Sequence, residues 1–392
     1  MEIQMLPFTR LAKDRTSAFN KLDGEFFLPT GKVPIIDQGK AAIAGYTDDQ
    51  SLAVSLGFPV VVFGDHTQIF KFVDHAFVLG ADGTKVLEVD QDLIDPLYFY
   101  HVIRSARFPN KGYSRYFKYL KKQSFPVPEN VEDQRRIAVL LSRAESLIAQ
   151  RKGSLRLLDE LVRSVFLEMF GDPVRNEKGW RKKPLDELGD VSTGKTPPSA
   201  REGMFVPDLG SYEGMPFVTP GDLESEEPVM RYVTEEGAAT TRPVRSGATL
   251  VCCIGATIGK VGQAVGTSAF NQQINAIEWH DARADQFGVI LMRLIRPVIR
   301  HLGGTNTTLP ILKKSKFEKV KVIDPNPEMK LVFALRVNAI ARLKQNLTES
   351  AGHIEQLYGS LSQRAFRGEL KNSIAPDYEA SSLKSSTSGI NA

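Results

Sequence analysis

Between Phe125 and Pro173 the chain reads FPVPENVEDQRRIAVLLSRAESLIAQRKGSLRLLDELVRSVFLEMFGDP, with apolar residues at alternating intervals of four and three. From Lys321 to Leu370 it reads KVIDPNPEMKLVFALRVNAIARLKQNLTESAGHIEQLYGSLSQRAFRGEL, which repeats that pattern. The two stretches align without a gap at a constant shift of 196 residues, half the chain length. The pairs include Glu132 and Glu328, Leu147 and Leu343, Leu161 and Leu357, and Phe170 and Phe366. The chain is therefore one unit written twice.

Each stretch is a heptad repeat with an apolar seam. The seam of the first copy is Ile137, Leu141, Ala144, Ile148, Arg151, Leu155, Leu158, Val162, Val165 and Met169. The seam of the second copy is Phe333, Val337, Ile340, Lys344, Leu347, Ala351, Ile354, Tyr358, Leu361 and Ala365. Five heptads predict a coiled coil rather than an ordinary surface helix. Each helix of about 38 residues would be ~57 Å long, and Gly171 and Gly368 are expected to end them.

Each seam contains one charged residue, Arg151 or Lys344. Two apolar seams in one chain can bury each other. If the helices run antiparallel, a pseudo-twofold axis relates the two halves of the chain. A lone polar seam residue often fixes the register of such a pair, and we expect that role for Arg151 and Lys344.

The segments before the two helices also repeat, although more loosely. Pro34–Gly39 resembles Pro216–Gly221, Val60–Thr67 resembles Leu250–Thr257, and Ala76–Phe77 resembles Ala269–Phe270. These pieces are rich in Val, Ile and Phe and are bounded by Gly and Pro, which predicts short β-strands. We also expect a short helix near Leu97–Arg107 and another near Phe287–Arg300.

The predicted fold class is α+β. Two tandem globular domains, of mixed α/β structure with short strands, are separated by two long helices that form an antiparallel, pseudo-twofold coiled coil. The expected boundaries are 1–127 for the first globular domain, 128–172 for the first helix, 173–323 for the second domain and 324–370 for the second helix. Residues 371–392, rich in Ser and Thr, are expected to be a disordered tail.

Composition excludes several classes of protein. The 392 residues are 42% hydrophobic and 24% charged, which is ordinary for a globular protein and unlike a wholly disordered one. No apolar run is long enough for a transmembrane helix, and the N-terminus lacks the apolar core of a signal peptide. The two cysteines, Cys252 and Cys253, are adjacent and form no disulfide framework, so we expect a cytoplasmic location. The net charge of +4 does not by itself indicate a polyanionic partner.

No catalytic motif is present in the sequence. Gly255–Lys260 superficially resembles a phosphate-binding loop, but the spacing between its glycines is one residue short and Val261 replaces the required Ser or Thr. A tight turn between two strands is the better interpretation. The sequence also lacks the motifs of amino-methyltransferases, zinc proteases and serine hydrolases. Of the six histidines, only His66, in Gly64–Thr67, lies in a turn suited to a specific contact, either structural or with a ligand.

Two corresponding segments favour recognition of nucleic acid. Arg104–Lys122 interleaves basic and aromatic residues, and its counterpart Gly303–Lys316 combines Asn and Thr with lysines. Such side chains suit contacts with phosphates and base edges. A single surface lysine is as often merely solvated, but two such stretches at corresponding places in the repeat strengthen the interpretation.

With these motifs in order, the chain resembles the specificity subunit of Type I restriction–modification enzymes. The first half contributes VPIIDQGKAAIAGYTDD from Val33 and VVVFGDHTQIFKFVDHAFVLGADGTKVL from Val60. The second half contributes GWRKKPLDELGDVSTGKTPPS from Gly179, PFVTPGDL from Pro216, GATIGKVG from Gly255 and FNQQINAI from Phe270. The helix endings FLEMFGDP and SQRAFRGEL are also similar to those of the family. The resemblance covers the chain apart from the tail.

The resemblance implies a non-catalytic subunit in which two target-recognition domains each read a short half-site of double-stranded DNA. The two helices would set the spacer between the half-sites. It implies two modification subunits as partners and, through them, restriction subunits. S-adenosylmethionine, ATP and Mg²⁺ would be bound by those partners, with no cofactor on this chain and no membrane association. We expect the modification subunits to grip the exposed helix faces, including Arg135, Arg136, Glu145 and Arg163.

The candidate DNA-binding residues follow from the basic and polar side chains of the repeat. In the first half they are Lys40, Tyr46, His66, Arg104, Lys111, Arg115, Lys118, Lys121 and Lys122. In the second half they are Lys195, Lys260, Gln272, Gln273, Asn306, Lys313 and Lys314. Gln272 and Gln273 could equally be a buried hydrogen-bonding pair. No catalytic or metal-binding residue is expected.

Two other functions compete with this one. A coiled-coil adaptor that binds only proteins would share the long helices but would not need the basic and aromatic stretches. A stand-alone DNA methyltransferase or nuclease would need the catalytic motifs that the sequence lacks.

Overall fold

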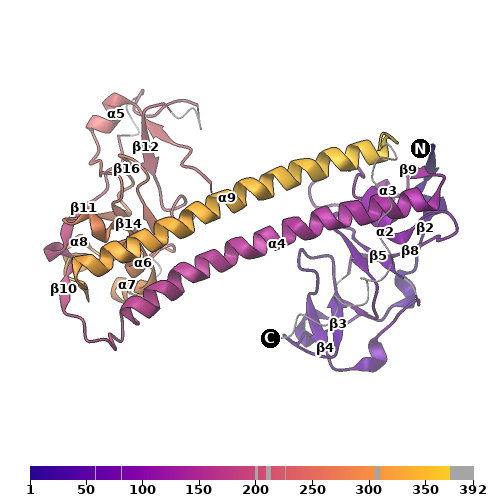
Figure 1. The fold of residues 1–392 in the computed structure, drawn as a ribbon, viewed down its shortest axis with the longest axis horizontal. Coiled ribbons are helices and arrows are strands. Elements are labelled where there is room, and N and C mark those ends of the chain that lie inside the picture. Colours follow the sequence, from indigo (N-terminus) through magenta and orange to yellow (C-terminus); the bar gives the residue numbers. More distant parts are fainter. Residues whose placement is uncertain are drawn as a thin grey trace. The chain divides into compact units, whose positions relative to one another are not determined.

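The chain folds into two units, each assembled from parts that are distant in sequence (Figure 1). Unit 1 contains Met1–Arg151 and the segment that begins at Ser350, and unit 2 contains Lys152–Glu349. The computed structural model describes residues 1–57, 59–80, 82–198, 202–208, 213–225, 227–304 and 310–370. The expected disordered tail, 371–392, lies outside the described residues.

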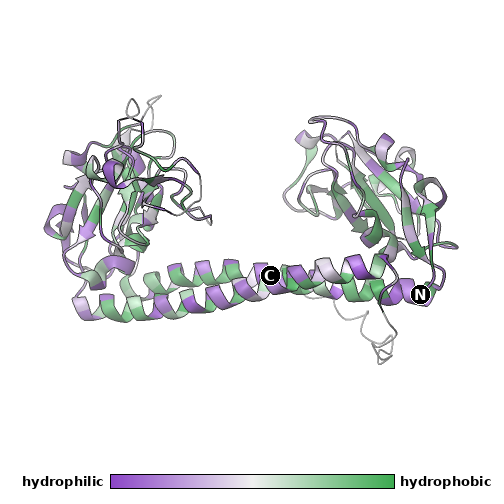
Figure 2. Cartoon of the chain, turned by 90° about the horizontal axis from the view of Figure 1, so that it is seen from above, coloured by the Kyte–Doolittle hydropathy of each residue, from purple (hydrophilic) through white to green (hydrophobic). Residues whose placement is uncertain are grey.

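The two long helices are present. α4 spans Val131–Phe170 and α9 spans Pro327–Phe366, and each has 40 residues. Every seam position is buried or half-buried, because the heptad spacing keeps these positions on one side of each helix. Hydrophobic and hydrophilic residues alternate along both helices in Figure 2. Gly171 and Gly368 follow the helix ends with φ of 74° and 75°, a conformation that glycine adopts without strain.

Within each unit the two helices run antiparallel. In unit 1, Ile137 and Leu141 near the start of α4 share a core with Ala365 near the end of α9. In unit 2, Phe166 near the end of α4 packs edge-on against Phe333 near the start of α9. The charged seam residue Lys344 finds a partner across the pair, because its ammonium lies 2.8 and 3.1 Å from the two carboxylate oxygens of Asp159.

Unit 1 contains three small sheets. A four-stranded sheet has the order β2-β8-β5-β6, from Ala12–Asp14, Thr84–Val89, Val60–Gly64 and Phe70–Val73. A three-stranded sheet has the order β4-β3-β7, from Gly45–Thr47, Val33–Ile36 and Val78–Leu79. A third pairs β1 with β9, from Ile3–Pro7 and Ser124–Pro128. Besides the long pair, the α-helices of its described residues are α1 (Phe8–Leu11), α2 (Pro96–Ile103) and α3 (Phe117–Leu120).

Unit 2 repeats this topology. Its four-stranded sheet is β11-β17-β14-β15, from Gly189–Thr193, Ile274–Trp279, Thr249–Cys252 and Val261–Gln263. Its three-stranded sheet is β13-β12-β16, from Tyr232–Val233, Met215–Val218 and Ala269–Phe270. β10 (Lys182–Pro184) pairs with β18 (Lys321–Ile323). The other α-helices in the described part of unit 2 are α5 (Glu235–Ala239), α6 (Asp285–Leu294), α7 (Arg296–Gly303) and α8 (Lys314–Phe317).

The internal repeat therefore extends to strand order and direction. In both three-stranded sheets one neighbour of the central strand is antiparallel and the other is parallel: β3 with β4 and β7, and β12 with β13 and β16. The central strands β5 and β14 are buried along their whole length, because each is paired on both sides and covered by side chains from both faces. Their apolar sequences reflect this burial.

The turn between Gly255 and Lys260 joins β14 to β15, so the interpretation as a strand-turn-strand is confirmed. The helix expected over Phe287–Arg300 is instead two helices, α6 and α7, which meet at Ile295. Pro297 stands in the first turn of α7, where the absence of an N–H costs no hydrogen bond, and its ring does not fit inside a continuous helix.

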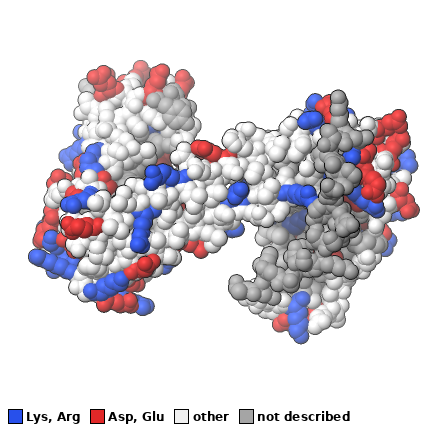
Figure 3. Space-filling model, in the orientation of Figure 1, with Lys and Arg blue, Asp and Glu red and all other residues white. Residues whose placement is uncertain are grey.

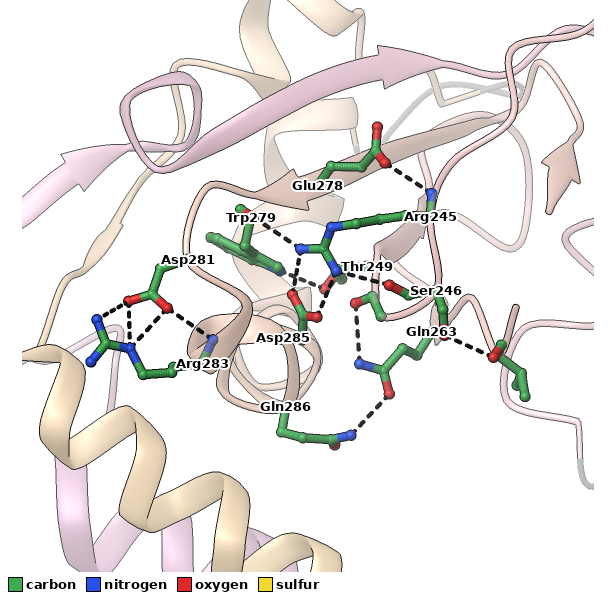
Figure 4. A network of polar contacts seen from close by, with 12 residues as sticks. Arg245, Ser246, Thr249, Gln263, Glu278, Trp279, Asp281, Arg283, Asp285 and Gln286 are labelled. Atoms are coloured by element: carbon green, nitrogen blue, oxygen red, sulfur yellow. Dashed lines mark hydrogen bonds and ion pairs between the residues drawn. The ribbon is translucent and has the colours of Figure 1, made fainter. Parts of the chain in front are cut away.

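A partly buried polar network fixes α6 to its sheet (Figure 4). Both terminal nitrogens of Arg245 donate to the carboxylate of Asp285, at 2.7 and 2.9 Å, and Arg245 also donates to the backbone oxygen of Trp279 at 2.9 Å. Gly247, with φ of 89°, is required here, because a Cβ at this position would lie 2.2 Å from the Asp285 carboxylate. This bidentate pair holds the start of α6 in a single position.

Candidate nucleic-acid interface

In unit 1 the candidate site is built on a stacked pair of rings at the end of β5. The imidazole of His66 and the ring of Tyr113 lie parallel, with centroids 4.4 Å apart and an interplanar angle of 3°. Tyr113 has 88% of its surface exposed. A large aromatic ring held in the open presents a flat apolar face to solvent, which is typical of contact surfaces.

The fold holds His66 rigidly beneath this ring. Its Nδ1 lies 3.1 Å from the backbone oxygen of Ser114. Its backbone N–H donates to Oε1 of Gln38, whose Nε2 donates in turn to the backbone oxygen of Asp82 at 2.9 Å. Gly83 passes so close that a Cβ would lie 2.7 Å from the imidazole. Three loops that are far apart in sequence are therefore joined around one imidazole.

Four of the predicted basic residues belong to the segments that hold the stacked pair. Lys40 is exposed in the loop that contains Gln38, and Arg115 is exposed beside Ser114. Lys111 and Lys118 lie over the ring of Tyr119, with their ammonium groups 5.8 and 5.1 Å from its centre. The interleaving of basic and aromatic residues in the sequence thus becomes direct contact between the two kinds of side chain.

The other predicted residues of unit 1 occupy different surroundings. Lys121 lies over the ring of Phe117, 5.2 Å from its centre, and Lys122 is exposed in the turn before β9. Tyr46 is half-buried in β4 and is bonded through its backbone to Leu28. Arg104 is engaged with the long helices, where its guanidinium pairs with Glu145 and lies 3.3 Å from the hydroxyl of Tyr358.

Unit 2 builds a corresponding cluster at the end of β14. In unit 1 the backbone oxygen of Asp65 accepts the N–H of Tyr116, and in unit 2 the backbone oxygen of Cys253 accepts the N–H of Leu312, both at 2.8 Å. Each bond ties the strand end to the segment that enters a short helix, α3 or α8. Lys313 and Lys314 are exposed at the start of α8, and Lys260 is half-buried at the start of β15.

The two neighbouring glutamines of unit 2 differ from each other. Gln272 is exposed and its Oε1 accepts a hydrogen bond from the hydroxyl of Thr196, which follows the exposed Lys195. Gln273 is half-buried, and its backbone oxygen accepts the N–H of Cys253 at 2.8 Å. The structure therefore brings Lys195, Gln272 and the β14 end together. Asn306 lies outside the described residues.

The electrostatics of these clusters are mixed. On the face shown in Figure 3, both globular parts carry Lys and Arg as well as Asp and Glu side chains. In unit 1, Asp37 is neutralised by Lys71 at 3.4 Å, and burial lowers the pKa of that lysine. Burial raises the pKa of the Cys253 thiol to about 12, so it stays protonated. Among the described residues, no group of three or more His, Cys, Asp or Glu side chains is placed to hold a metal ion.

Sequence reasoning missed the most exposed member of the site, Tyr113. It lay inside the basic and aromatic stretch, but nothing in the stretch separates an exposed tyrosine from Tyr116, which is buried. Gln38 was also missed, because its role as a bridge between His66 and Asp82 depends on a contact between distant loops.

None of the helices in the described part of the chain is long and apolar enough to cross a membrane.

Comparison with known sequences confirms the resemblance. Residues 177–334 match the family model described as the Type I restriction modification DNA specificity domain. The HindI specificity subunit of Haemophilus influenzae is 24% identical over 202 residues, which is 49% of this chain and 42% of that protein. The putative MjaX specificity subunit of Methanocaldococcus jannaschii is 21% identical over 328 residues, 75% of this chain and 73% of that protein. The chain thus spans less than half of the first relative.

Solved structures show the same fold. The S subunit of a Type I restriction–modification system from M. genitalium superposes with a TM-score of 0.61 at 14% identity, covering 93% of this chain and 96% of that one. A chain from a structural study of assembly and conformational transition in the Type I system gives a TM-score of 0.54 at 17% identity, covering 94% and 98%. Two sheet-containing units with long helices are thus shared across both chains.

Proposed function

We propose that this chain, which resembles Type I specificity subunits in sequence and fold, is the non-catalytic DNA-recognition subunit of a Type I restriction–modification complex in the cytoplasm. The observation that carries the proposal is the repeated loop cluster. Two units of the same topology each gather basic and polar side chains at the end of the corresponding strand, β5 or β14, and unit 1 adds the stacked rings of His66 and Tyr113. Different side chains at equivalent places predict an asymmetric, two-part DNA target.

The two-part design has a physical advantage. Duplex DNA presents equivalent surfaces one helical turn apart, ~34 Å. Two weak readers linked by a stiff connection bind much more tightly than either alone, because the second contact becomes intramolecular. The long helices, predicted at 128–172 and 324–370 between the globular domains, would provide that connection.

Exposed apolar side chains on the long helices indicate two equivalent binding surfaces, one for each of two copies of a protein partner. Val139, Leu147 and Leu357 are exposed in unit 1. At the positions related to these by the repeat, Leu335, Leu343 and Leu161 are exposed in unit 2. Apolar side chains that stay exposed at equivalent places are typical of contact surfaces. We assign both sets to modification subunits, which would bind S-adenosylmethionine and in turn recruit the ATP- and Mg²⁺-dependent restriction subunits.

Of the charged helix residues expected to contact these subunits, Glu145 is engaged with Arg104 within unit 1. Arg135 lies near Glu132 and Arg136 near Asp133 on their own helix turn. The apolar sets are therefore the stronger part of the proposed surface, because a charge already paired within the chain offers less to a partner.

Co-expression with a modification subunit, followed by mapping of methylated sites in the host DNA, tests the proposal. We expect a two-part methylated motif with a fixed unspecified spacer. Exchange of the loops around His66 should change one half-site and exchange of the loops around Gln272 the other. A stable complex that neither binds nor methylates DNA would support the protein-only adaptor instead. Methylation or cleavage by this chain alone would support the stand-alone enzyme.

A further inference from the structure

Unit 2 contains a cavity of about 790 Å³ where α6 faces the long helices. Its charged lining consists of Asp159, Arg163, Glu224, Arg293, Arg296 and Lys344, and the rest is mostly aliphatic. This volume lies in the range of sites for small organic molecules, ~300–1,000 Å³. The cavity is formed entirely within unit 2.

The corresponding place in unit 1 is occupied by the protein's own side chains. There Arg104 pairs with Glu145, contacts the hydroxyl of Tyr358, and lies 5.1 Å from the centre of the Tyr100 ring. His101 completes the packing with a contact of 2.8 Å between its Nε2 and the hydroxyl of Ser142. In unit 1, the carboxylate of Glu145 and the phenol group of Tyr358 are therefore the partners of Arg104.

One aromatic contact in each unit shows which residues of α2 and α6 correspond to each other. In unit 1, Tyr98 of α2 packs edge-on against Phe366, and in unit 2, Phe287 of α6 packs edge-on against Phe170. Phe366 and Phe170 are equivalent in the repeat. Arg104 stands at the same spacing after Tyr98 as Arg293 stands after Phe287. Arg293 is therefore the counterpart of Arg104.

The two repeat-related partners of Arg104 are absent around Arg293, where the nearby acidic group is Asp159, which is already paired with Lys344. The repeat places Ala341 where unit 1 has Glu145, and Val162 where unit 1 has Tyr358. Both smaller side chains line the cavity. The part of the cavity beside Arg293, Val162 and Ala341 therefore corresponds to the space that the Glu145 carboxylate and the Tyr358 ring occupy in unit 1.

The lining has an excess of positive charge. Two of its four cations are paired, Lys344 with Asp159 and Arg296 with Glu224. Nε of Arg296 is nevertheless buried without a hydrogen-bond partner among the described residues. Burial, together with the nearby Arg300, lowers the pKa of Arg296. A cationic group in such surroundings favours an anion, since burying polar groups without a partner is costly.

We propose that this cavity binds a small organic anion that carries a flat ring. Its anionic group would meet Arg293 in place of the Glu145 carboxylate, and its ring would lie against Val162 in place of the Tyr358 side chain. The proposal goes beyond DNA recognition and does not depend on it, because every contact that it uses lies within unit 2.

The test uses the full chain and 3-(4-hydroxyphenyl)propionate, which combines a phenol ring with a carboxylate. Ligand-observed NMR and calorimetry should show binding with Kd of about 1 mM or tighter, as its size allows. Inorganic phosphate lacks the ring and tyramine lacks the anion, and both should bind about tenfold more weakly. Arg293→Gln should weaken binding of the phenol acid about tenfold. Arg336→Gln, on α9 outside the cavity lining, should leave it unchanged.

A second variant keeps the test valid if Arg293→Gln folds poorly. Val162→Tyr with Ala341→Glu rebuilds the plug of unit 1 and should abolish binding while the thermal midpoint stays the same or rises. Binding that survives the plug would overturn the proposal, as would no binding at about 10 mM probe. A third result would also overturn the proposal: the Arg293→Gln variant loses DNA affinity in the assembled complex, and the unsubstituted chain binds phosphate as tightly as the phenol acid. That result would assign the arginines of the cavity to the DNA backbone.

Discussion

Tyr113 shows how a single residue acquires a role from its support. Its ring is 88% exposed, yet it is held parallel to an imidazole that is itself fixed by Ser114 and Gln38. An exposed ring on a free loop would lose conformational entropy on binding, whereas a ring already stacked loses less. Tyr113 is for this reason the first residue of unit 1 to test.

Substitution Tyr113→Ala should weaken DNA binding by the assembled complex about tenfold, because truncation of a tyrosine that anchors an interface commonly costs more than about 1 kcal/mol. Tyr113→Phe should keep most of the affinity, since the ring rather than the hydroxyl makes the contact. Fluorescence anisotropy with the methylated target measures both. Phe26→Ala, at another exposed aromatic of unit 1, is the matched control. Equal losses in the Tyr113→Ala and Phe26→Ala variants would contradict the assignment.

His101 gives a pH-dependent stability. Burial lowers its pKa to about 4, from an ordinary value of 6.5. The folded state therefore resists protonation while the unfolded state accepts it. The contribution of His101 to the free energy of unfolding is therefore fully present above pH 6.5. It declines as the pH falls toward 4, by up to about 3 kcal/mol. His101→Gln can still hydrogen-bond to Ser142 but does not titrate. Urea unfolding at pH 7, 6 and 5 should show a smaller decline for the variant, and identical declines would show that other groups cause it.

At the scale of elements, the long helices were the most predictable part of the fold. A 3.5-residue period over five heptads leaves no competing structure, and the glycines at 171 and 368 marked the ends. The strands β5 and β14 were equally evident, because a fully buried strand is apolar throughout. The break between α6 and α7 was not foreseen, since the apolar pattern continues past Pro297 and hides the effect of its ring.

The candidate site was less predictable than the fold. Lys40, His66 and Arg115 are far apart in the sequence, and only the tertiary structure shows that Gln38 links the loops around His66. Arg104 appeared in the same stretch as Arg115, but it pairs with Glu145 of a distant helix. Which basic side chain stays free depends on long-range partners, and a local pattern does not contain that information.

The apolar sets on the long helices lead to a prediction of stoichiometry. Leu147→Glu in unit 1 and Leu343→Glu in unit 2 should each remove one modification subunit, and the double variant should remove both. The reason is that a buried carboxylate without a partner is costly in an apolar contact. Light scattering of co-purified complexes gives the masses. Leu157→Glu is the control, because its repeat counterpart is His353 and it belongs to neither set. Loss of both partners from a single substitution would contradict two independent surfaces.

At the scale of the whole molecule, α4 and α9 each cross the boundary between the units without a break, at Arg151 and at Ser350. A continuous helix transmits length in steps of 1.5 Å per residue. If the helices set the distance between two DNA readers, as we propose, a change in helix length has to appear in the DNA target and nowhere else.

Duplication of one heptad in both helices, Lys152–Leu158 in α4 and Thr348–Ile354 in α9, preserves the seam and lengthens the pair by about 10 Å. The spacer of the methylated motif should grow by about three base pairs, at 3.4 Å per base pair, with both half-sites unchanged. Sequencing of methylated DNA measures this. Exchange of the two heptads without a change in length should leave the spacer as it is, and duplication in one helix alone should destabilise the protein because the seams no longer match. An unchanged spacer in the doubly lengthened protein would mean that the helices hold the units together without setting their distance, and the modification subunits would then have to set it.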